Sequence, residues 1–578
     1  KRDHMATGMS AMAWATAIMA VVAAVQAGWG TAAYKPSVAV DNFSPEVTPW
    51  PRPTVTQNGT TTLSIDPDTV SVSGAGPPGS IVAVAVARLL AGMANGSVLA
   101  PLLPAPVAIE GPIASLALRI ADSTTTLPTA TTNESYTMEV SASGITIHAA
   151  TSFGALHALS SLQQMVEKPL CPGSSPCPLR IRGCPWHIED TPRFTHRGVL
   201  IDTSRHFLPV RVLLTFIDAM ATSKLNVLHW HIVDAQAFPF ASEATELGRG
   251  AWSPEETYSV ADLRTVVAHA AARGVRVIPE VDTPGHVHSW GVAYPEVVTP
   301  CSPPTRGNSN PPLDPSSNTT YTVVGKILEE LGQIFVDPFF HLGGDEVMYD
   351  CWNASGRIRA YMEKQGYGTD FSKLQQEYET RLLEVAAHAL PGRTLIMYQE
   401  VFDEGVSIPE TLVVDVWKRG NNNTVPKSPA LNVEVGIVAR AGHRVVVANG
   451  PNGEWYLNDG FGNGLCQVGG CLYALWGDVY TNEPLDGANL TPSLEALVLG
   501  GEASLWGEEI DATNIMSKAW PRAAAFAERM WSPRATATKM DQVNEAGPRL
   551  ARVVCKMKAQ GLQVSPIAPG SCSHWPRH

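Results

Sequence analysis

The chain has 578 residues, of which 44% are hydrophobic and 16% are charged, and its formal net charge is −13. This length predicts two to four domains, or one large barrel with an accessory domain. The acidic balance argues against nucleic acid as a partner, because phosphate binding needs a basic face. The sequence has no zinc-type cysteine pairing, no Walker loop and no GxGxxG opening a helix, so we expect no metal and no cofactor.

The first 27 residues have the pattern of a secretory signal peptide. Lys1 and Arg2 precede an apolar run from Ala11 to Ala27, which ends in the small-residue cleavage site Val25–Ala27. The run is short for a membrane anchor, so the pattern favours a removable signal. We therefore expect a route through the secretory pathway and no membrane span after signal removal.

Two further features agree with secretion. Sequons of the type Asn-x-Ser/Thr predict surface glycosylation at Asn58, Asn95, Asn133, Asn318, Asn353, Asn422 and Asn489, whereas Asn42 is set aside because Pro45 follows it closely. The cysteines include four close pairs, with Cys184 left over: Cys171 and Cys177, Cys301 and Cys351, Cys466 and Cys471, and Cys555 and Cys572. In an oxidising compartment such pairs indicate disulfides, the alternative being buried free thiols, and the spacing leaves the connectivity open.

An α/β accessory domain is predicted before the main body of the chain. Tyr136–Val140 and Gly144–His148 alternate like the two strands of a hairpin, and Thr151–Met165 has helical spacing. The predicted organisation is a signal peptide at 1–27, an irregular segment at 28–62, the accessory domain at 63–167, a linker at 168–192 and a catalytic domain at 193–578.

From Phe194 onward, short apolar runs alternate with helical segments. The runs are Gly198–Asp202, Val227–Asp234, Val275–Asp282, Phe339–Glu346, Thr394–Glu400, Leu412–Trp417, Arg444–Ala448 and Val498–Glu508. The helical segments between them include Val210–Thr222, Val260–Arg273, Thr320–Leu331 and Phe371–Ala389. Continuous apolar strands alternating with helices indicate a buried parallel sheet, and this number of units predicts a (β/α)8 TIM barrel. Trp520–Gly561 should be helical and pack against it.

The predicted strands end in polar and aromatic residues. Active sites of such barrels lie at the carboxyl ends of the strands. Those ends carry Arg205, His231, Asp234, Asp282, His286, Asp345, Glu346, Tyr398, Glu400, Trp417, Tyr456, Trp506 and Glu508. Carboxylates handle protons and hydroxyls, and flat apolar rings stack on a pyranose, so this set indicates sugar chemistry.

Several of these motifs together resemble family-20 glycoside hydrolases, the β-N-acetylhexosaminidases. His341-Leu342-Gly343-Gly344-Asp345-Glu346 is similar to the HxGGDE signature of that family. Other similar blocks are Arg197–His206, Val227–Asp234, Pro279–His286 and Ser504–Glu508. The resemblance covers roughly residues 63–565, and it is greatest to the eukaryotic lysosomal or extracellular enzymes that remove terminal GlcNAc and GalNAc.

Asp345 and Glu346 are neighbours in the sequence, which bears on the mechanism. Most retaining glycosidases place an acid and a nucleophile about 5–5.5 Å apart across the bond, but in family 20 the substrate's 2-acetamido oxygen attacks C1. The resemblance therefore implies that Glu346 is the general acid and later the base. It implies that Asp345 orients the acetamide N–H, and that Tyr456 donates to the acetamide oxygen. We expect burial beside Asp345 to raise the pKa of Glu346 and an acidic pH optimum to result.

The resemblance assigns roles to further residues. Arg205 should bind O3 and O4 of the sugar, and Glu508 should accept from the remaining hydroxyls. Asp234 and His286 should support the acid, with His231 and Asp282 behind them; a buried structural role is the alternative for both histidines. The predicted wall of the acetamide pocket consists of Tyr398, Trp417 and Trp506.

Some positions depart from the family pattern. Tyr398 stands where relatives often have Trp, and Ala235 stands where a second Asp is common. The pair Asn458-Asp459 supplies no positive charge for a sulfate or sialate, so we expect a preference for neutral substrates. The resemblance also implies the disulfides Cys301–Cys351 and Cys555–Cys572 and a homodimer. It leaves the natural aglycone and the choice between lysosome and exterior open.

The sequence argues against two other interpretations. A chitinase-like barrel enzyme would carry a DxxDxDxE strand motif, which the sequence lacks. A catalytically inactive carbohydrate-binding protein on the same scaffold would have lost the acid, Arg205 or Tyr456, and all three are present.

Overall fold

The computed structural model describes residues 48–94, 109–168, 178–301, 310–418, 432–450, 453–457, 474–568 and 572. The chain divides into a unit of Lys1–Asn42 and a unit of Phe43–His578, and the fold below belongs to the second. Several predictions lie outside the described residues: the signal peptide and the positions Asn42, Asn95, Asn422 and Asn458.

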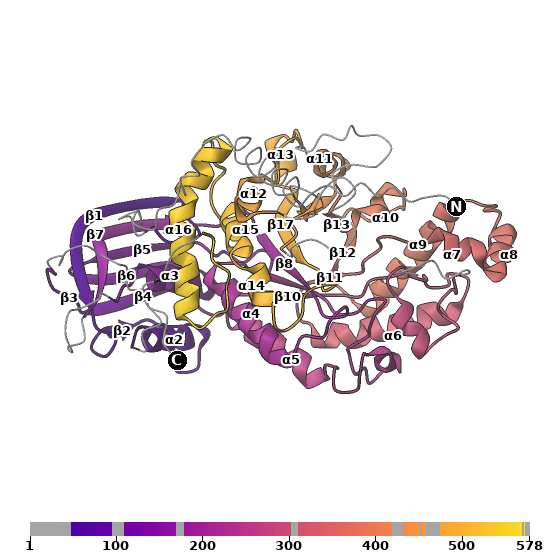
Figure 1. Cartoon of the computed structure of the whole chain (residues 1–578), viewed down its shortest axis with the longest axis horizontal. Coiled ribbons are helices and arrows are strands. Elements are labelled where there is room, and N and C mark those ends of the chain that lie inside the picture. Colours follow the sequence, from indigo (N-terminus) through magenta and orange to yellow (C-terminus); the bar gives the residue numbers. More distant parts are fainter. Residues whose placement is uncertain are drawn as a thin grey trace, which may run out of the picture. The chain divides into compact units, whose positions relative to one another are not determined.

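The accessory domain is a seven-stranded sheet in the order β2-β4-β6-β5-β7-β1-β3. Its elements are β1 (Val55–Ile65), β2 (Ser71–Ser73), α2 (Ile81–Ala94), β3 (Pro112–Ile113), β4 (Ser115–Asp122), β5 (Tyr136–Ser141), β6 (Gly144–Thr151), α3 (Ser152–Met165) and β7 (Leu179–Asp190). The predicted hairpin is confirmed, with Val140 opposite Ile145 in an antiparallel ladder. Figure 1 shows these strands side by side in indigo and purple.

Strands β1 and β7 correct two expectations. β1 begins within the segment predicted to be irregular (28–62), and β7 lies within the predicted linker (168–192). After Val55, β1 has no apolar side chain until Leu63, so its first part shows no apolar period. The cysteines and prolines of 168–192 suggested a linker, but the ladder between β1 and β7 shifts register around Cys184, and such an irregularity accommodates Pro185 within a strand.

The predicted barrel is confirmed as a closed ring of eight parallel strands. They are β8 (His196–Asp202), β9 (Val227–His231), β10 (Arg276–Glu280), β11 (Phe339–His341), β12 (Thr394–Tyr398), β13 (Val413–Val416), β14 (Arg444–Val447) and β17 (Val498–Leu505). Each lies within one of the predicted apolar runs, except that β8 begins two residues earlier, at His196. The ring closes where β17 pairs with β8, with Leu505 opposite Ile201.

Helices join most of the strands, and the predicted ones are confirmed as α4 (Val210–Thr222), α5 (Val260–Ala271), α6 (Asn318–Ile334) and α9 (Phe371–Ala389). Further helices are η2 (Leu247–Gly250), η3 (His288–Val292), α7 (Tyr349–Ala354), α8 (Gly356–Gln365), α10 (Gln399–Asp403), α11 (Val433–Arg440), α12 (Trp476–Thr481) and α13 (Pro492–Glu495). A short hairpin, β15 (Asn449–Gly450) with β16 (Gly453–Glu454), follows β14.

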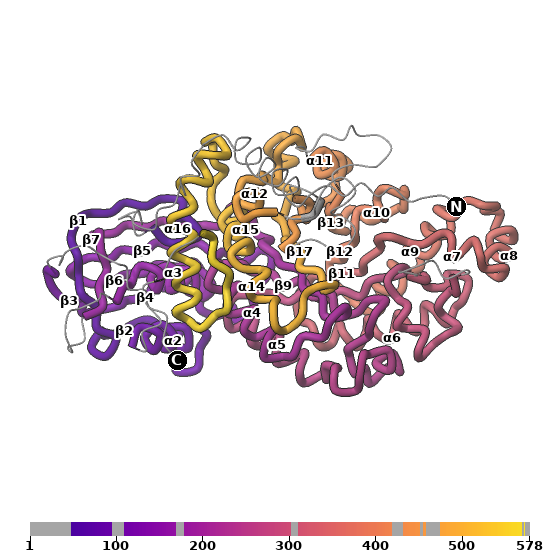
Figure 2. Tube along the Cα trace, in the orientation of Figure 1, coloured from indigo at the N-terminus to yellow at the C-terminus, as the bar shows by residue number. Residues whose placement is uncertain are grey.

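The segment Trp520–Gly561, which the sequence predicted to be helical, contains α15 (Arg522–Trp531) and α16 (Lys539–Ala559), and α14 (Ile515–Ala519) precedes it. Pro533 ends α15, because the residue before a proline is disfavoured in helical conformation. Helix α16 lies alongside α3 of the accessory domain (Figures 1 and 2), and Nζ of Lys556 donates to the carbonyl of Gln163 at 3.0 Å.

Buried ion pairs join the accessory domain to the bottom of the barrel. Arg197, at the start of β8, is fully buried and forms two hydrogen bonds of 2.7 and 2.9 Å with the carboxylate of Glu134. Lys224 of the barrel lies 2.7 Å from Asp190 of β7. Each buried cation therefore has a carboxylate from the other domain.

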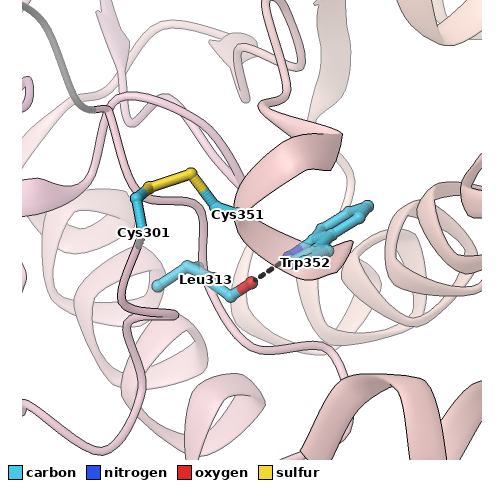
Figure 3. Close-up of a disulfide and its surroundings, with 4 residues drawn as sticks. All are labelled: Cys301, Leu313, Cys351 and Trp352. Atoms are coloured by element: carbon cyan, nitrogen blue, oxygen red, sulfur yellow. Dashed lines mark hydrogen bonds between the residues drawn. A yellow bond between two sulfur atoms is a disulfide. The ribbon is translucent and has the colours of Figure 1, made fainter. Parts of the chain in front are cut away.

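Two of the predicted disulfides, Cys301–Cys351 and Cys555–Cys572, are present. Figure 3 shows the first, beside the hydrogen bond of 2.9 Å from Trp352 Nε1 to the carbonyl of Leu313. The pairing of Cys171 with Cys177 and that of Cys466 with Cys471 stay predictions, because Cys171, Cys177, Cys466 and Cys471 all lie outside the described residues. Cys184, which the sequence left without a partner, is a buried free thiol.

The described sequon asparagines are exposed, as glycosylation requires: Asn58, Asn133, Asn318, Asn353 and Asn489. None of the helices in the described ranges combines the length and apolar character that crossing a bilayer requires.

Candidate active site

The structure brings the predicted site residues that it describes to one end of the barrel. Arg205, Asp282, Trp417 and Trp506 follow the last residues of β8, β10, β13 and β17, while His231 and Tyr398 end β9 and β12. Tyr456 comes from a loop, but its backbone bridges to Ser504 of β17. That bridge places Tyr456 beside the strand end that carries Trp506 and Glu508.

Two glycines turn the chain sharply after β11. Gly343 and Gly344 have φ values of +72° and +108°, in the region that favours glycine. A Cβ on Gly343 would overlap the Oδ1 atom of Asp282, and that atom accepts a hydrogen bond of 2.9 Å from the Gly344 N–H. Asp345 and Glu346 therefore stand one after the other on a single tight turn.

His286 faces both carboxylates of this turn. Its Nε2 atom lies 3.6 Å from Asp345 Oδ2 and 3.5 Å from Glu346 Oε2, while Nδ1 lies 3.1 Å from Asp234 Oδ2. Burial opposes a charge on this ring, but Asp234, Asp345 and Asp282 raise the pKa of His286 well above its ordinary value. His286 is therefore a cation that faces the carboxylate pair.

Asp234 joins His286 to Arg205. Its Oδ2 atom lies 2.9 Å from Arg205 Nη2 and 2.8 Å from His231 Nε2. Burial opposes ionisation here too, but Arg205 and His286 hold the pKa of Asp234 well below its usual range. Arg205 is further fixed by Asp202 at 2.8 Å and has Glu508 at 4.0 Å. Its guanidinium carbon lies 5.3 Å from the centre of the Trp506 ring.

The pKa of Glu346 is lowered, whereas the sequence predicted that it would be raised. The imidazole of His286, with Nε2 3.5 Å from Glu346 Oε2, is the main cause that lowers it, helped by the charges of Lys418 and Arg205. Burial does raise the pKa of Glu346, as we expected, but the side chain is 60% exposed and the opposing charges outweigh this effect, so the pKa is lowered. Asp345 is the more enclosed partner, and burial together with repulsion from Glu346 raises the pKa of Asp345.

The aromatic side chains are held by carboxylates. Trp417 Nε1 donates to Glu400 Oε2 at 2.9 Å, and Lys418 pairs with the same carboxylate. Burial and then repulsion from Asp345 raise the pKa of Glu400 to about 7. The hydroxyl of Tyr398 donates to Glu280 Oε2 at 3.3 Å. The indole orientation thus depends on Glu400, which the sequence placed at a strand end but gave no role.

Sequence reasoning missed several polar residues around the site. Asp202 and Gln236 bind Arg205, and Lys418 binds Glu400. His229, Glu280, His341 and Glu502 lie inside the barrel and are buried. The alternation of His229 and His231 along β9 was an available signal, since side chains two apart in a strand share a face.

Three groups of described residues place at least three metal-type ligands together: His229 with Glu280 and His341, His229 with Asp415 and Glu502, and Asp282 with His286 and Asp345. Metal binding requires a neutral imidazole nitrogen. His229 and His286 both have carboxylate partners that raise their pKa, which disfavours that form. The chemistry of these donors therefore fits ion pairs better than a metal.

Known proteins share this sequence pattern and this fold. Residues 194–534 match the family model for the glycosyl hydrolase family 20 catalytic domain, and residues 49–165 match a model described as beta-acetyl hexosaminidase like. The human beta-hexosaminidase subunit beta is 38% identical over 450 residues, covering 77% of this chain and 74% of that protein. Beta-hexosaminidase 1 of Arabidopsis thaliana is 34% identical over 549 residues, covering 90% and 93%.

A solved structure agrees with these relatives. The chitobiase of Flavobacterium johnsoniae superimposes with a TM-score of 0.72 at 28% identity, covering 89% of this chain and 73% of that one.

Proposed function

The chain belongs to glycosyl hydrolase family 20, and on that premise we propose that it is a β-N-acetylhexosaminidase. It hydrolyses terminal non-reducing β-linked GlcNAc and GalNAc residues of oligosaccharides and glycoconjugates. The observation that carries this proposal is the single turn bearing Asp345 and Glu346, with His286 within 3.6 Å of both. Two carboxylates on one turn fit the substrate-assisted mechanism of this family, in which the acetamide oxygen of the substrate is the nucleophile.

The reaction follows from this placement. The acetamide oxygen attacks C1 as the bond to the aglycone breaks, and Glu346 gives its proton to the leaving oxygen. Asp345 accepts a hydrogen bond from the acetamide N–H and stabilises the developing oxazolinium, while Tyr456 donates a hydrogen bond to the acetamide oxygen. Glu346 then takes a proton from the water that attacks C1, which restores the acid and gives retention.

The pocket around this centre binds the rest of the sugar. Arg205 holds O3 and O4, with its guanidinium fixed by Asp202 and Asp234 at 2.8 and 2.9 Å. Glu508, 4.0 Å from the same guanidinium, accepts from another hydroxyl. Tyr398, Trp417 and Trp506 enclose the acetamide methyl. Because Asn458-Asp459 lacks a cation, neutral sugars are the favoured substrates.

Cellular context is part of the same proposal. Two disulfides and the exposed sequon asparagines support passage through an oxidising, glycosylating compartment on the way to the lysosome or the exterior. A homodimer is proposed from the resemblance, and light scattering of the purified protein measures it. The scaffold retains Glu346, Arg205 and Tyr456, which favours an active enzyme over an inactive carbohydrate-binding protein.

One assay tests the proposal. The wild-type protein should hydrolyse an aryl β-N-acetylglucosaminide but not the matching β-glucoside, which has no acetamide to act as nucleophile. Glu346→Gln should abolish turnover, whereas Glu363→Gln, an exposed acid on α8, should not. Equal hydrolysis of both glycosides, or full activity of Glu346→Gln, would overturn the assignment.

A further inference from the structure

A line of alternating carboxylates and imidazoles runs from the candidate catalytic acid into the barrel. In order, its members are Glu346, His286, Asp234, His231, Glu280, His229, Glu502 and His196. Beyond Glu346 every member is buried. The outer part of the line belongs to the proposed mechanism, but the inner part, from Glu280 to His196, has no role in it.

Glu280 is the central member of the inner part. Its Oε2 atom lies 2.6 Å from His231 Nδ1 and 3.1 Å from His229 Nε2, both on β9. His341 of β11 lies 3.4 Å from Oε1, and Tyr398 of β12 donates to Oε2 at 3.3 Å. The side chain of Glu280 has no solvent exposure.

Other charged groups face this cluster from the neighbouring strands. Asp282 and Asp345 lie near enough to Glu280 to repel it. Glu502 of β17 lies beyond His229, with its Oε1 atom 2.8 Å from His229 Nδ1. Asp415 of β13 lies beyond His341, 3.9 Å from His341 Nε2.

The two carboxylates around His231 determine its protonation. Nε2 faces Asp234 at 2.8 Å and Nδ1 faces Glu280 at 2.6 Å. A neutral imidazole has one N–H, so donation to both carboxylates requires the imidazolium. Burial opposes that charge, but Glu280 and Asp234 raise the pKa of His231 well above its ordinary value. Without Glu280, a neutral ring could still donate from Nε2 to Asp234.

We propose that Glu280 is a positioning residue for the hydrolytic reaction. It holds His231 as a doubly donating imidazolium, and His231 in turn fixes the Asp234 carboxylate between Arg205 and His286. The inference rests on the proposed function, because the reaction is what Arg205 and His286 serve.

Glu280→Gln tests the link while preserving the shape of the side chain. The amide can donate to Nδ1, so His231 is free to lose its proton nearer the ordinary pKa of about 6.5. We measure kcat/KM on an aryl β-N-acetylglucosaminide as a function of pH. On the alkaline side, kcat/KM of Glu280→Gln should fall more steeply than that of the wild type, by the loss of one more proton. A loss of stability alone would lower activity without adding an ionisation.

Glu502→Gln is the matched control. It neutralises a carboxylate that is 3% exposed and frees His229 in the same way, but the carboxylates paired with His229 are Glu280 and Glu502, not Asp234. We expect kcat/KM of Glu502→Gln to fall on the alkaline side as steeply as that of the wild type. Glu280→Asp retains the charge, so this variant should also keep the wild-type steepness.

The outcomes separate the two proposals. If the wild type is active but the alkaline limb of kcat/KM is unchanged in Glu280→Gln, the role of Glu280 is overturned and the proposed function stands. The same holds if that limb becomes as steep in Glu502→Gln or Glu280→Asp as in Glu280→Gln. An inactive wild type would overturn the proposed function and this inference with it. If Glu280→Gln does not fold, His231→Gln should lower kcat/KM about tenfold or more through loss of a charge-assisted hydrogen bond; a change within about twofold would refute the link.

Discussion

Nη2 of Arg205 lies 2.9 Å from Oδ2 of Asp234, and the same carboxylate oxygen lies 3.1 Å from Nδ1 of His286. One carboxylate thus links the proposed sugar-binding cation to the ring that faces Asp345 and Glu346. Substrate binding and proton transfer should therefore depend on the same residue.

Asp234→Asn should impair binding and turnover together. Each charge-assisted hydrogen bond contributes about 1.5–3 kcal/mol, so the loss of two should lower kcat/KM by at least about a hundredfold. Steady-state kinetics should show a raised KM and a lowered kcat. Asp202→Asn is the comparison, because Asp202 binds Arg205 at 2.8 Å and should act mainly on KM. A variant of Asp234 with unchanged KM would contradict the link to Arg205.

The coupled carboxylates predict an acidic, bell-shaped pH profile. In the free protein the pKa of Glu346 is lowered and that of Asp345 is raised, so a single shared proton favours Asp345. The reaction needs the opposite arrangement. The acetamide N–H should stabilise ionised Asp345, and the aglycone should shield Glu346 from water, so bound substrate moves the proton to Glu346.

Two measurements check this sign. Because the reactive form requires one proton on the pair, kcat/KM should fall both when the pair gains a second proton and when it loses the first. The alkaline limb of kcat should lie at higher pH than that of kcat/KM, since the pKa of Glu346 rises in the complex. An activity optimum above about pH 8, or an alkaline limb of kcat at lower pH than that of kcat/KM, would contradict the transfer of the proton to Glu346 in the complex.

Gly343→Ala should disrupt the catalytic turn more than its backbone angle explains. Gly343 and Gly366 have φ values of +72° and +76°, so alanine at either position costs about 1–2 kcal/mol of backbone strain. A Cβ at Gly343 also overlaps Asp282, whereas one at Gly366 meets no atom within 4 Å.

Comparison of the two alanine variants isolates the overlap. Gly366→Ala should retain activity and show only the strain in urea unfolding. Gly343→Ala should lose about a hundredfold or more in kcat, because a displacement of about 1 Å at a reacting group has that effect. Equal kinetics in the two variants would show that the close approach to Asp282 is unimportant.

The barrel was predictable because its strands are buried on both faces. Val227–Asp234 and Val275–Asp282 read as continuous apolar runs, and the structure places β9 and β10 within them. The glycines before Asp345 likewise signalled a sharp turn. These features depend on neighbouring residues in the sequence, so they can be predicted without knowing which distant segments are in contact.

The remaining features depend on contacts between distant segments. Glu280 and Glu502 are single acids within strands, and only barrel closure brings both onto His229. Strand β1 begins with a polar segment whose pairing depends on β7. The lowered pKa of Glu346 depends on the His286 imidazole and on a side chain exposure of 60%, neither of which spacing along the chain reveals.

Glu134→Gln should destabilise the fold without altering the site. It leaves Arg197, which is fully buried, without its carboxylate, and an unpaired buried charge costs about 3–5 kcal/mol. Asp486→Asn breaks an ion pair whose two side chains are 51% and 46% exposed, and it should change stability by less than about 1 kcal/mol. Urea unfolding measures both, and KM of the folded protein should stay unchanged.

The pH dependence of this effect follows from the pKa of Glu134. Burial opposes ionisation, but Arg197 and a hydrogen bond with His157 lower that pKa to about 2. The pKa of Glu134 in the folded protein lies below the ordinary pKa of a glutamate carboxyl group. The stabilisation is therefore present at any pH above that ordinary pKa and is lost only as the pH falls toward about 2. The difference in unfolding free energy between wild type and Glu134→Gln should therefore be nearly the same at pH 7 and at about pH 5.5. A difference that disappeared by that mildly acidic pH would mean that Glu134 is protonated there and that the pair with Arg197 does not hold its charge.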